Sequence, residues 1–468
     1  MSAVGRHRCT AMSISASTLV VALLGAAGAL ALGLVFRHRP RVGVAVWLLV
    51  VALIPVWTGV TLKFYFMPAT VVAMVLLVFV KHRLGELRLG LPDYLMAAFM
   101  LSCLAPIVTG GATLSTAFVV ITSWLFPYLI GRLVAGLVGV RWLYGAVAVV
   151  FTVVAVGLIM EMVTGWNPFL AFPDRNPDLF SVWGDLQTRG AVTRSEGAFG
   201  HSIAAGSATA MAIPMALGSR FRPWLRCAMA VVMGIGVVLT VSRVSIAGAV
   251  IGVVLVLFLL RELAPRIRAG LILMFGVLAA AALPFVLRTL RSAGDEATAS
   301  AGYRGSLLDL VPGISVLGMS PLARKSPDGK FFFGTFRSID SQLILTGLQY
   351  GWFALILGLL GLLAAVLIVI SRRGTAATIA VVAQIPALAT VALITQYADF
   401  FWFVVGLAVC GQVSETLARR GLEDTAGDLA NASAKLSERA SPDPRSGSLT
   451  AIVSRSGDSS GRGLLGEQ

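Results

Sequence analysis

Charged side chains are scarce in this chain of 468 residues. Asp, Glu, Lys and Arg make up 13% of it, whereas hydrophobic residues make up 57%. Soluble domains usually carry about 25% charged residues. The mean hydropathy is +0.88. This shortage of charge excludes an ordinary soluble globular domain and indicates a chain that is embedded in a membrane.

The chain also lacks the usual signatures of metal clusters, nucleotide binding and redox chemistry. It has no C-x-x-C pair, Walker A sequence, H-E-x-x-H, C-x-x-C-H or strand-associated GxGxxG. Cysteine is rare, and three of its four positions fall in apolar stretches, where it behaves as a small hydrophobic residue: Cys9, Cys103, Cys227 and Cys410. These absences disfavour a structural disulfide, a metal cluster or an ATPase.

Ionisable groups are nearly absent from the centres of the apolar stretches. Ion-driven transporters usually keep acids at mid-membrane depth, because a charge there is expensive and is retained only for function. The nearest acids here, Glu161 and Asp399, fall close to the outer ends of their predicted helices. We also find no clear inverted repeat of the kind that often marks secondary transporters. The sequence therefore disfavours ion-driven transport.

Long apolar stretches recur along most of the chain. A spanning helix needs roughly 20 mostly apolar residues, since its backbone groups must be satisfied within the segment. We predict an all-α polytopic membrane domain over 15–417 with about 12–13 transmembrane helices. The short tail 1–14 precedes it, and the Ser- and Gly-rich tail 418–468 is expected to be disordered and cytoplasmic. The predicted helices cover 15–36, 42–61, 66–80, 93–109, 113–131, 142–164, 203–218, 225–241, 244–260, 269–287, 341–370, 376–395 and 399–416.

Positive charge gathers in every second connection between these helices. Short cytoplasmic loops retain Lys and Arg, so we interpret the net charge of +15 as a topology signal and not as nucleic-acid binding. The two long polar loops, about 165–202 and 288–340, then lie on the extracytoplasmic face. Arg6 and Arg8 oppose an outward N-terminus, which leaves the side of the N-terminus and the exact span count open. The basic connections contain Arg37/Arg39/Arg41, Lys81/Arg83/Arg88, Arg132/Arg141, Arg220/Arg222/Arg226, Arg261/Arg266/Arg268 and Arg372/Arg373.

The first long loop ends in a dense group of polar residues, TRSEGAFGH. This group contains Arg194, Glu196 and His201, directly before the predicted helix 203–218. A second outer turn holds Ser242 and Arg243 between two apolar helices. Arg243 has an alternative explanation, because an arginine at a helix end often extends to the lipid headgroups. His201 has one too, as a helix-start residue without chemistry.

The second long loop carries its polar residues just before the predicted helix 341–370. Arg324 and Lys325 are interpreted as solvated loop charges. Gly347 and Gly351 form a G-x-x-x-G, whose usual meaning is close helix packing. The candidate functional residues of this loop are Tyr303, Arg304, Arg337 and Asp340.

Taken in order, these segments resemble a known family. RSEGAFGH after the first long loop, SR at the next outer turn, YRGSLLDLVPGISVLGMSPL, and SID ahead of a glycine-containing helix are similar to the bacterial O-antigen ligase and polysaccharide polymerase superfamily. The resemblance covers about 185–370. It implies a GT-C-like membrane glycosyltransferase that works without metal or cofactor. Its donor would be a glycan on undecaprenyl diphosphate, at the outer face of the plasma membrane.

The resemblance assigns the diphosphate to arginines. The planar guanidinium contacts phosphate oxygens in pairs and stays charged at all relevant pH values. The residues carried over for this role are Arg194, Arg243 and Arg304, followed by Arg337. Glu196, His201 and Tyr303 are further candidates beside them. The expected catalytic set is Asp340, Arg304 and Arg194.

Asp340 marks a departure from the ligase branch, which usually has a histidine at this position. An aspartate there is more similar to the polymerase branch. It would act as the general base on the acceptor hydroxyl or orient the sugar. Two alternatives stay open: Asp340 as the N-cap of the helix that begins near Ser341, or as a counter-ion to arginine.

The sequence therefore predicts a polymerase of a cell-surface polysaccharide, such as an exopolysaccharide, a capsule or an O-antigen-like glycan. The alternatives are a ligase that moves finished glycan to a lipid, wall or protein acceptor and, from another class, a transporter or flippase of a lipid-linked sugar. The expected partners are the lipid-linked donor, the glycan acceptor, membrane lipid, and a chain-length regulator and flippase of the same pathway. The expected location is a bacterial plasma membrane, with the active face extracytoplasmic.

Overall fold

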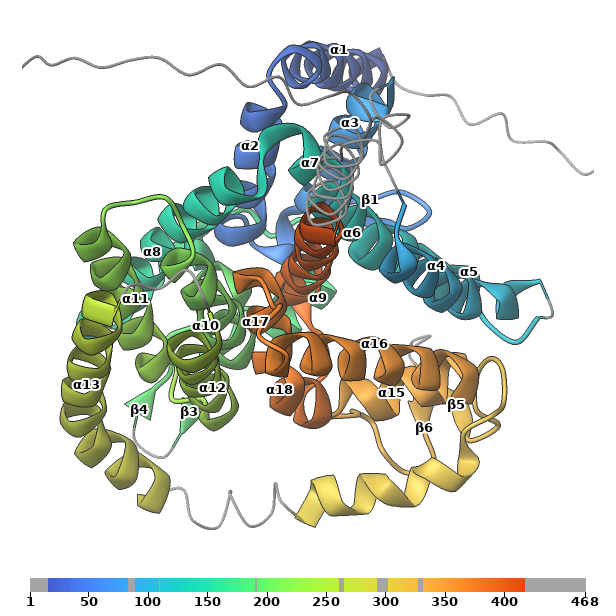
Figure 1. The fold of residues 1–468 in the computed structure, drawn as a ribbon. Coiled ribbons are helices and arrows are strands. Elements are labelled where there is room, and N and C mark those ends of the chain that lie inside the picture. The colour runs from blue at the N-terminus through green and yellow to red at the C-terminus, as the bar shows by residue number, and fades with distance from the viewer. Residues whose placement is uncertain are drawn as a thin grey trace, which may run out of the picture. The chain divides into compact units, whose positions relative to one another are not determined.

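The computed structural model describes residues 16–82, 89–108, 110–189, 192–260, 265–292, 302–326 and 331–416 (Figure 1). The predicted tails 1–14 and 418–468 lie outside these ranges. The chain up to Ser414 forms one compact unit, and Glu415–Gln468 is a second. Within the described ranges the fold is helical, and its strands pair only into short two-stranded antiparallel hairpins.

Several helices are long and apolar enough to cross a membrane. By length and composition the described residues contain five such helices: Leu114–Val138, Val140–Thr164, Pro265–Pro284, Trp352–Ile370 and Thr395–Thr416. The shorter apolar helices are Pro40–Leu53, Pro68–Val80, Leu91–Ile107, Ser202–Leu217, Pro223–Leu239, Arg243–Leu259 and Ala376–Thr390. Helix α1 spans Ala16–His38. A helical multi-pass architecture is thus supported, whereas 12–13 complete spans exceed what helix length alone supports.

Proline shortens the second predicted helix. We predicted a helix over 42–61, but α2 (Pro40–Leu53) ends before Ile54, which is extended and precedes Pro55. The residue before a proline is biased away from the helical region, and proline has no N–H to continue the bonding pattern. The following residues form η1 (Val56–Thr58) and the hairpin of β1 (Val60–Thr61) with β2 (Tyr65–Phe66).

Glycine and a helix junction divide two more predicted helices. The helix expected over 341–370 is broken at Gly351, whose φ of +93° separates α15 (Gln342–Tyr350) from α16 (Trp352–Ile370). The helix expected over 376–395 is also divided, into α17 (Ala376–Ala383) and α18 (Ile385–Thr390), with Gln384 between them. Both divisions correct the sequence-based prediction.

A bundle rich in small side chains forms the densest part of the core. Helix α10 (Ser202–Leu217) packs against α8 (Val140–Thr164), α11 (Pro223–Leu239), α12 (Arg243–Leu259) and α17, as Figure 1 shows for the first three. Every residue of α10 from Ala204 onward is buried. Alanine, glycine and serine let helix backbones approach closely. At Gly206, for example, a Cβ would lie 2.6 Å from Thr240 Oγ1.

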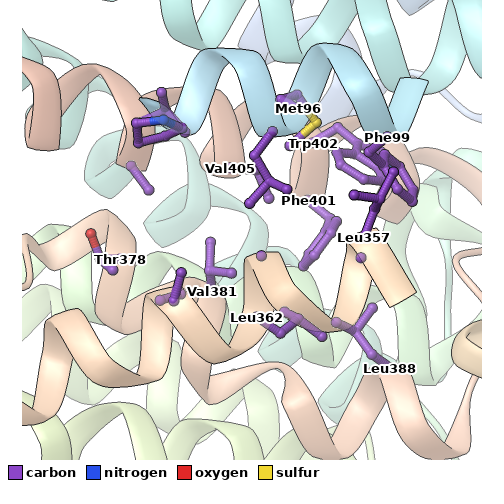
Figure 2. A pocket seen from close by; sticks show the side chains of 18 of the residues that line it. Met96, Phe99, Leu357, Leu362, Thr378, Val381, Leu388, Phe401, Trp402 and Val405 are labelled. Carbon is purple, nitrogen blue, oxygen red and sulfur yellow. The ribbon is translucent and has the colours of Figure 1, made fainter. Parts of the chain in front are cut away.

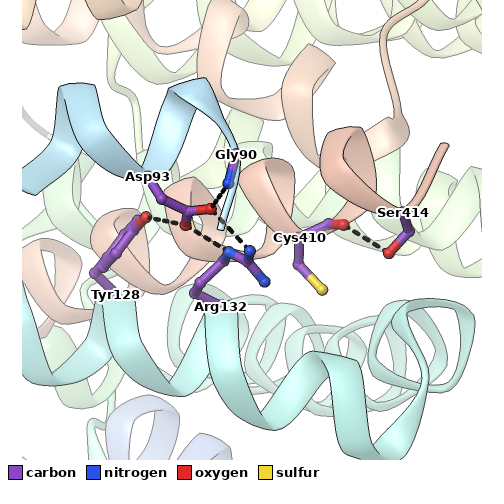
Figure 3. A network of polar contacts seen from close by, with 6 residues as sticks. All are labelled: Gly90, Asp93, Tyr128, Arg132, Cys410 and Ser414. Carbon is purple, nitrogen blue, oxygen red and sulfur yellow. Dashed lines mark hydrogen bonds and ion pairs between the residues drawn. The ribbon is translucent and has the colours of Figure 1, made fainter. Parts of the chain in front are cut away.

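A buried ion pair joins α4 (Leu91–Leu104) to η5 (Ile130–Val134), a π-helical turn inside the Leu114–Val138 helix. Arg132 donates from Nε to Asp93 Oδ1 at 2.6 Å and from Nη2 to Asp93 Oδ2 at 2.8 Å (Figure 3). Tyr128 and the Gly90 N–H also donate to this carboxylate. We predicted Arg132 as a charge in a cytoplasmic loop. That interpretation is wrong, because the side chain is buried and paired.

Candidate functional site

The first long loop folds into short elements that return the chain to the end of α8. Helix α8 ends at Gly165, which has a left-handed conformation. The segment that leads into α10 contains two further left-handed glycines, Gly197 and Gly200. At Gly200 a Cβ would also lie 2.6 Å from the Trp183 carbonyl oxygen. The loop elements are η6 (Pro168–Ala171), α9 (Pro177–Trp183), β3 (Thr188–Arg189), β4 (Val192–Thr193) and η7 (Gly197–Phe199).

The carboxylate of Glu161 occupies the centre of this loop. Its Oε2 accepts hydrogen bonds from the N–H groups of Glu196 at 3.1 Å and Gly197 at 2.8 Å. Its Oε1 accepts from Asn167 Nδ2 at 3.0 Å. Successive backbone N–H groups of this kind form an anion-binding nest. Because Glu161 already fills this nest, the acid acts as an internal brace for the loop.

Two arginines of the loop reach the turn between α11 and α12. Arg194 donates from Nε to the Thr240 carbonyl oxygen at 3.0 Å, and Arg189 donates from Nη1 to the Val241 carbonyl oxygen at 3.0 Å. Thr240 is the C-cap of α11, where positive charge is favourable. Arg243, the first residue of α12, is exposed at the same turn. Arg189 and Arg194 are therefore bonded to the turn at which Arg243 begins α12.

Sequence reasoning found two of these three arginines. It selected Arg194 and Arg243 but missed Arg189, which lies on β3, whereas Arg194 directly follows β4. It also missed Gln187, whose backbone N–H and side chain contact two site residues. The amide oxygen of Gln187 accepts from Arg194 Nη1 at 3.4 Å. The pairing of β3 with β4 was the missing signal, since it places Gln187 opposite Arg194, whose N–H donates to the Gln187 carbonyl oxygen at 2.9 Å.

Glu196 is a buried acid with an unusual proton affinity. It is 1% exposed, and its Oε1 accepts a hydrogen bond from the Gln187 N–H at 3.0 Å. Burial raises the pKa of Glu196 to about 7, against the opposing effect of the Gln187 N–H. The neighbouring negative charge of Glu161 raises this pKa further, whereas Arg194 lowers it. Glu196 therefore titrates near neutral pH, where a group can exchange protons readily.

His201 caps the start of α10. Its Nδ1 accepts a hydrogen bond from the Ile203 N–H at 3.2 Å, and its ring packs edge-on against Trp183 at 5.7 Å. Burial lowers the pKa of His201 to about 4, and the positive charge of Arg194 acts in the same direction. The neutral ring is the form that caps the helix. This arrangement matches the helix-start alternative given for His201.

The second long loop brings Tyr303 and Asp340 together. The Tyr303 hydroxyl donates to the Ser338 carbonyl oxygen, and the Ser338 hydroxyl donates to Asp340 Oδ1 at 3.0 Å. The Tyr303 ring also packs edge-on against Phe336 at 5.6 Å. Burial raises the pKa of Tyr303, and the negative charge of Asp340 raises it further. Ser338 was not selected from the sequence, although it lies two residues from Asp340.

Asp340 is not the cap of the helix that follows it. The N-cap of α15 is Ser341, whose Oγ accepts from the Ile344 N–H at 3.3 Å. The capping alternative for Asp340 is therefore wrong. The counter-ion alternative also lacks support, because within the described residues Asp340 forms no ion pair. Its half-buried carboxylate is held by Ser338 alone among these residues.

The remaining two arginines of the second loop differ in exposure. Arg304 is half-buried, and its Nε is shielded from solvent without a hydrogen-bond partner in the part of the chain that the structure describes. Arg337 is exposed. A shielded guanidinium N–H is costly unless something accepts its hydrogen bond. Arg304 thus has donor capacity left for a ligand.

The segment before α15 supports the break at Gly351. The N–H groups of Gly318 and Ser320 donate to the carbonyl oxygens of Tyr350 at 2.9 Å and Leu348 at 2.7 Å. On the other side of the break, the Trp352 N–H donates to the Ser315 carbonyl oxygen at 2.8 Å. The PGISVLGMSPL part of the predicted motif thus satisfies backbone groups at the helix break and positions α15.

The two groups of candidate residues are linked through residues 391–396. Gln342, two residues after Asp340, donates its N–H to the Val391 carbonyl oxygen at 3.0 Å and accepts from the Leu393 N–H at 2.8 Å. Gln396 then donates to the Ala198 carbonyl oxygen of η7 at 3.0 Å. This segment therefore connects the start of α15 with the loop that holds Arg194 and Glu196.

An apolar cavity of about 310 Å³ has Gln342 among its lining residues (Figure 2). It is lined by α4, α15, α16, α17, α18 and the Thr395–Thr416 helix. Figure 2 shows Met96, Leu362 and Phe401 among the side chains that enclose it. On α16 its lining extends from Leu355 to Ile368, which corresponds to roughly 20 Å along a helix. The cavity is therefore long, and it is apolar over most of its length.

The chain matches no model of a known protein family, no curated protein and no solved structure. Within the described residues, no group of three or more His, Cys, Asp or Glu side chains is placed to hold a metal ion.

Proposed function

We propose that this protein is a membrane glycosyltransferase that polymerises a cell-surface polysaccharide, such as an exopolysaccharide, a capsule or an O-antigen-like glycan. It would transfer the growing chain from undecaprenyl diphosphate to a lipid-linked acceptor repeat at the outer face of a bacterial plasma membrane. The observation that carries this proposal is the gathering of Arg189, Arg194 and Arg243 at the turn between α11 and α12.

The arginines suit a diphosphate leaving group. Negative charge develops on the leaving diphosphate, and cations fixed in advance near that position lower the barrier. Arg194 and Arg189 are anchored on backbone carbonyls and provide fixed positive charge. Arg243 is exposed and is placed to contact phosphate oxygens directly. Arg304, with a shielded N–H that lacks a partner among the described residues, is the expected contact from the second loop.

Asp340 is the proposed general base. In a transfer of this kind the acceptor hydroxyl attacks the anomeric carbon and loses its proton to a nearby group. The bond between that carbon and the diphosphate oxygen breaks, and undecaprenyl diphosphate leaves with the bonding electrons. The hydrogen bond from Ser338 orients the Asp340 carboxylate for this role.

The apolar cavity supports a lipid-linked donor. An isoprenoid chain binds favourably only in a cavity whose lining is apolar. Burial of each CH₂ group contributes about 0.8 kcal/mol of favourable free energy relative to water. The cavity meets that condition over most of its length, and Gln342 in its lining follows Asp340 by two residues. A diphosphate headgroup near Asp340 and a tail in the cavity would therefore fit one donor molecule.

A deletion strain tests the proposal. Without the protein, single lipid-linked repeats should accumulate and long polymer should disappear on gels of the lipid-linked and surface pools. Normal chain length in that strain would contradict a polymerase. If polymer still forms but stays on its lipid carrier, the protein is instead a ligase. Substrate trapped on the inner leaflet would favour a flippase.

A further inference from the structure

Three side chains at the start of the Thr395–Thr416 helix carry buried oxygen atoms without hydrogen-bond partners among the described residues. They are both carboxylate oxygens of Asp399, Oε1 of Gln396 and Oγ1 of Thr395. Asp399 is 1% exposed and Gln396 is 2% exposed. Residues spaced by three or four positions share one face of a helix. Gln396 therefore lies on the same side of the helix as Asp399, and Thr395, whose φ is +47°, begins the helix directly before Gln396.

The position of the Gln396 amide is determined by its neighbours. Its Nε2 donates to the carbonyl oxygens of Ile54 at 2.7 Å and Ala198 at 3.0 Å. Both N–H groups of the amide are thus used. Since the two ends of an amide point in different directions, Oε1 is directed away from these carbonyls and needs a different donor.

The surroundings of Asp399 contain no paired cation among the described residues. Two turns further along the same helix face, Gly406 lies against the backbone of the Leu114–Val138 helix. Phe403, only one turn from Asp399, packs on Trp47 with ring centroids 5.1 Å apart. The indole N–H groups of Trp47 and Trp402 are buried and have no partner in the described ranges. An isolated ionised carboxylate in such a place costs several kcal/mol unless a positive charge joins it.

The geometry points to a binding site for one alkali cation, Na⁺ or K⁺, formed by Asp399, Gln396 and Thr395. All of the unpartnered atoms on these three side chains are oxygens, the ligands that hard cations prefer. One cation balances the single carboxylate charge and contacts several oxygen atoms at once, whereas a proton binds only one of these oxygen atoms. Water held by the indole donors of Trp47 and Trp402 would complete the coordination.

This site would stabilise the candidate functional site without taking part in its chemistry. Gln396 is bonded to the Ala198 carbonyl oxygen of η7, so a cation on Oε1 holds the helix start in contact with that loop. The proposal does not depend on the proposed transferase activity. It concerns only the binding of a cation to the folded chain.

Thermal unfolding of the purified full chain tests the inference. The protein in detergent micelles is heated in NaCl, KCl or choline chloride at equal ionic strength and pH. A ligand that binds only the folded state raises Tm as its concentration rises. We expect a higher Tm in NaCl or KCl than in choline chloride, and Asp399→Asn should abolish the difference. Equal Tm values in all three salts would overturn the proposal.

Glu161→Gln is the matched control for this experiment. Glu161 is also a buried acid, but both of its oxygens already accept hydrogen bonds. This variant should keep the salt dependence of the wild type. If Asp399→Asn does not fold, Thr395→Val removes one ligand oxygen without changing charge and should weaken the apparent cation affinity several-fold. Unchanged cation dependence in whichever of these two variants folds would overturn the site.

Discussion

At the residue scale, arginines with the same predicted role have different surroundings. Arg194 is 7% exposed and donates to Thr240 and Gln187, whereas Arg243 is exposed at the first position of α12. A buried arginine that holds a helix end contributes to stability as well as to local charge. An exposed one can contact a ligand without affecting the fold. Substitutions at the two positions should therefore separate binding from folding.

Arg243→Ala should lower glycan transfer at least tenfold, while the amount and Tm of the protein in membranes stay normal. Arg194→Ala should lower transfer and also destabilise the fold by about 1–3 kcal/mol, because it leaves buried acceptors unpaired. Transfer is measured with a purified lipid-linked donor and Tm by thermal unfolding. Arg324→Ala, an exposed change in β5 (Ala323–Lys325), should alter neither. Full activity of Arg243→Ala would remove the central contact of the proposed site.

Glu196 makes a prediction about pH. Its pKa of about 7 in the folded protein exceeds the ordinary value of 4.5, so the folded state binds more protons between these values. Stability linked to Glu196 is therefore present at low pH and is lost as pH rises through about 7. Glu196→Gln removes this loss. The variant should gain Tm relative to the wild type as pH rises from about 5 to about 8.

The titration of His201 does not affect the difference in Tm between Glu196→Gln and the wild type. Its lowered pKa of about 4 makes stability fall as pH drops below the ordinary value of 6.5, which is the opposite direction. Because His201 is present in both proteins, the difference between them isolates Glu196. A constant difference in Tm across this pH range would show that Glu196 does not titrate in the folded protein.

At the element scale, the division of one predicted helix into α15 and α16 depends on a single glycine. Gly351 has a φ of +93°, and a Cβ there would lie 2.7 Å from the Val316 carbonyl oxygen. Backbone hydrogen bonds between residues 315–320 and both sides of this break hold α15, which begins two residues after Asp340, in place. The position of the proposed base thus depends on a backbone conformation that other residues rarely adopt.

Gly351→Ala should destabilise the protein by more than about 2 kcal/mol and lower transfer, because strain and a steric clash act together. Gly110→Ala is the matched control. Gly110 also has a positive φ, of +73°, but a Cβ there would meet nothing within 4 Å. It should cost only the backbone strain, about 1 kcal/mol. Equal losses of Tm in the two variants would argue against a steric role for Gly351.

The Asp93–Arg132 ion pair also positions helices, since it joins α4 to η5 beside the apolar cavity. Asp93→Ala should cost about 3–5 kcal/mol, because a buried guanidinium loses its counter-ion. The double variant Asp93→Leu with Arg132→Met should recover much of this loss, as apolar replacements of a buried pair often do. Thermal unfolding of the single and double variants measures both. A double variant no more stable than Asp93→Ala would contradict this account.

At the scale of the whole molecule, distant segments of the chain meet around the candidate residues. The link from Asp340 to the Arg194 loop passes through Gln342, residues 391–396 and Ala198. The Gln396 amide bonds to Ile54 and Ala198, which lie 342 and 198 positions before it in the sequence. Asp340, the arginines of the first loop and the apolar cavity are therefore held by one connected framework of helices. A headgroup and a lipid tail of the same donor would contact different parts of that framework.

The sequence by itself determined the class of fold and much of the helix pattern. Apolar runs are local, so α8 and α11 begin and end within about two residues of their predicted bounds. For Tyr303 and Asp340, the sequence predicted only that both belong to one loop, and not that Ser338 bonds to both. Only the tertiary structure decided the partners of Arg194, the burial of Arg132, the carboxylate brace of Glu161 and the contribution of Arg189. These depend on contacts between residues tens of positions apart, and such contacts leave no periodic signal in the chain.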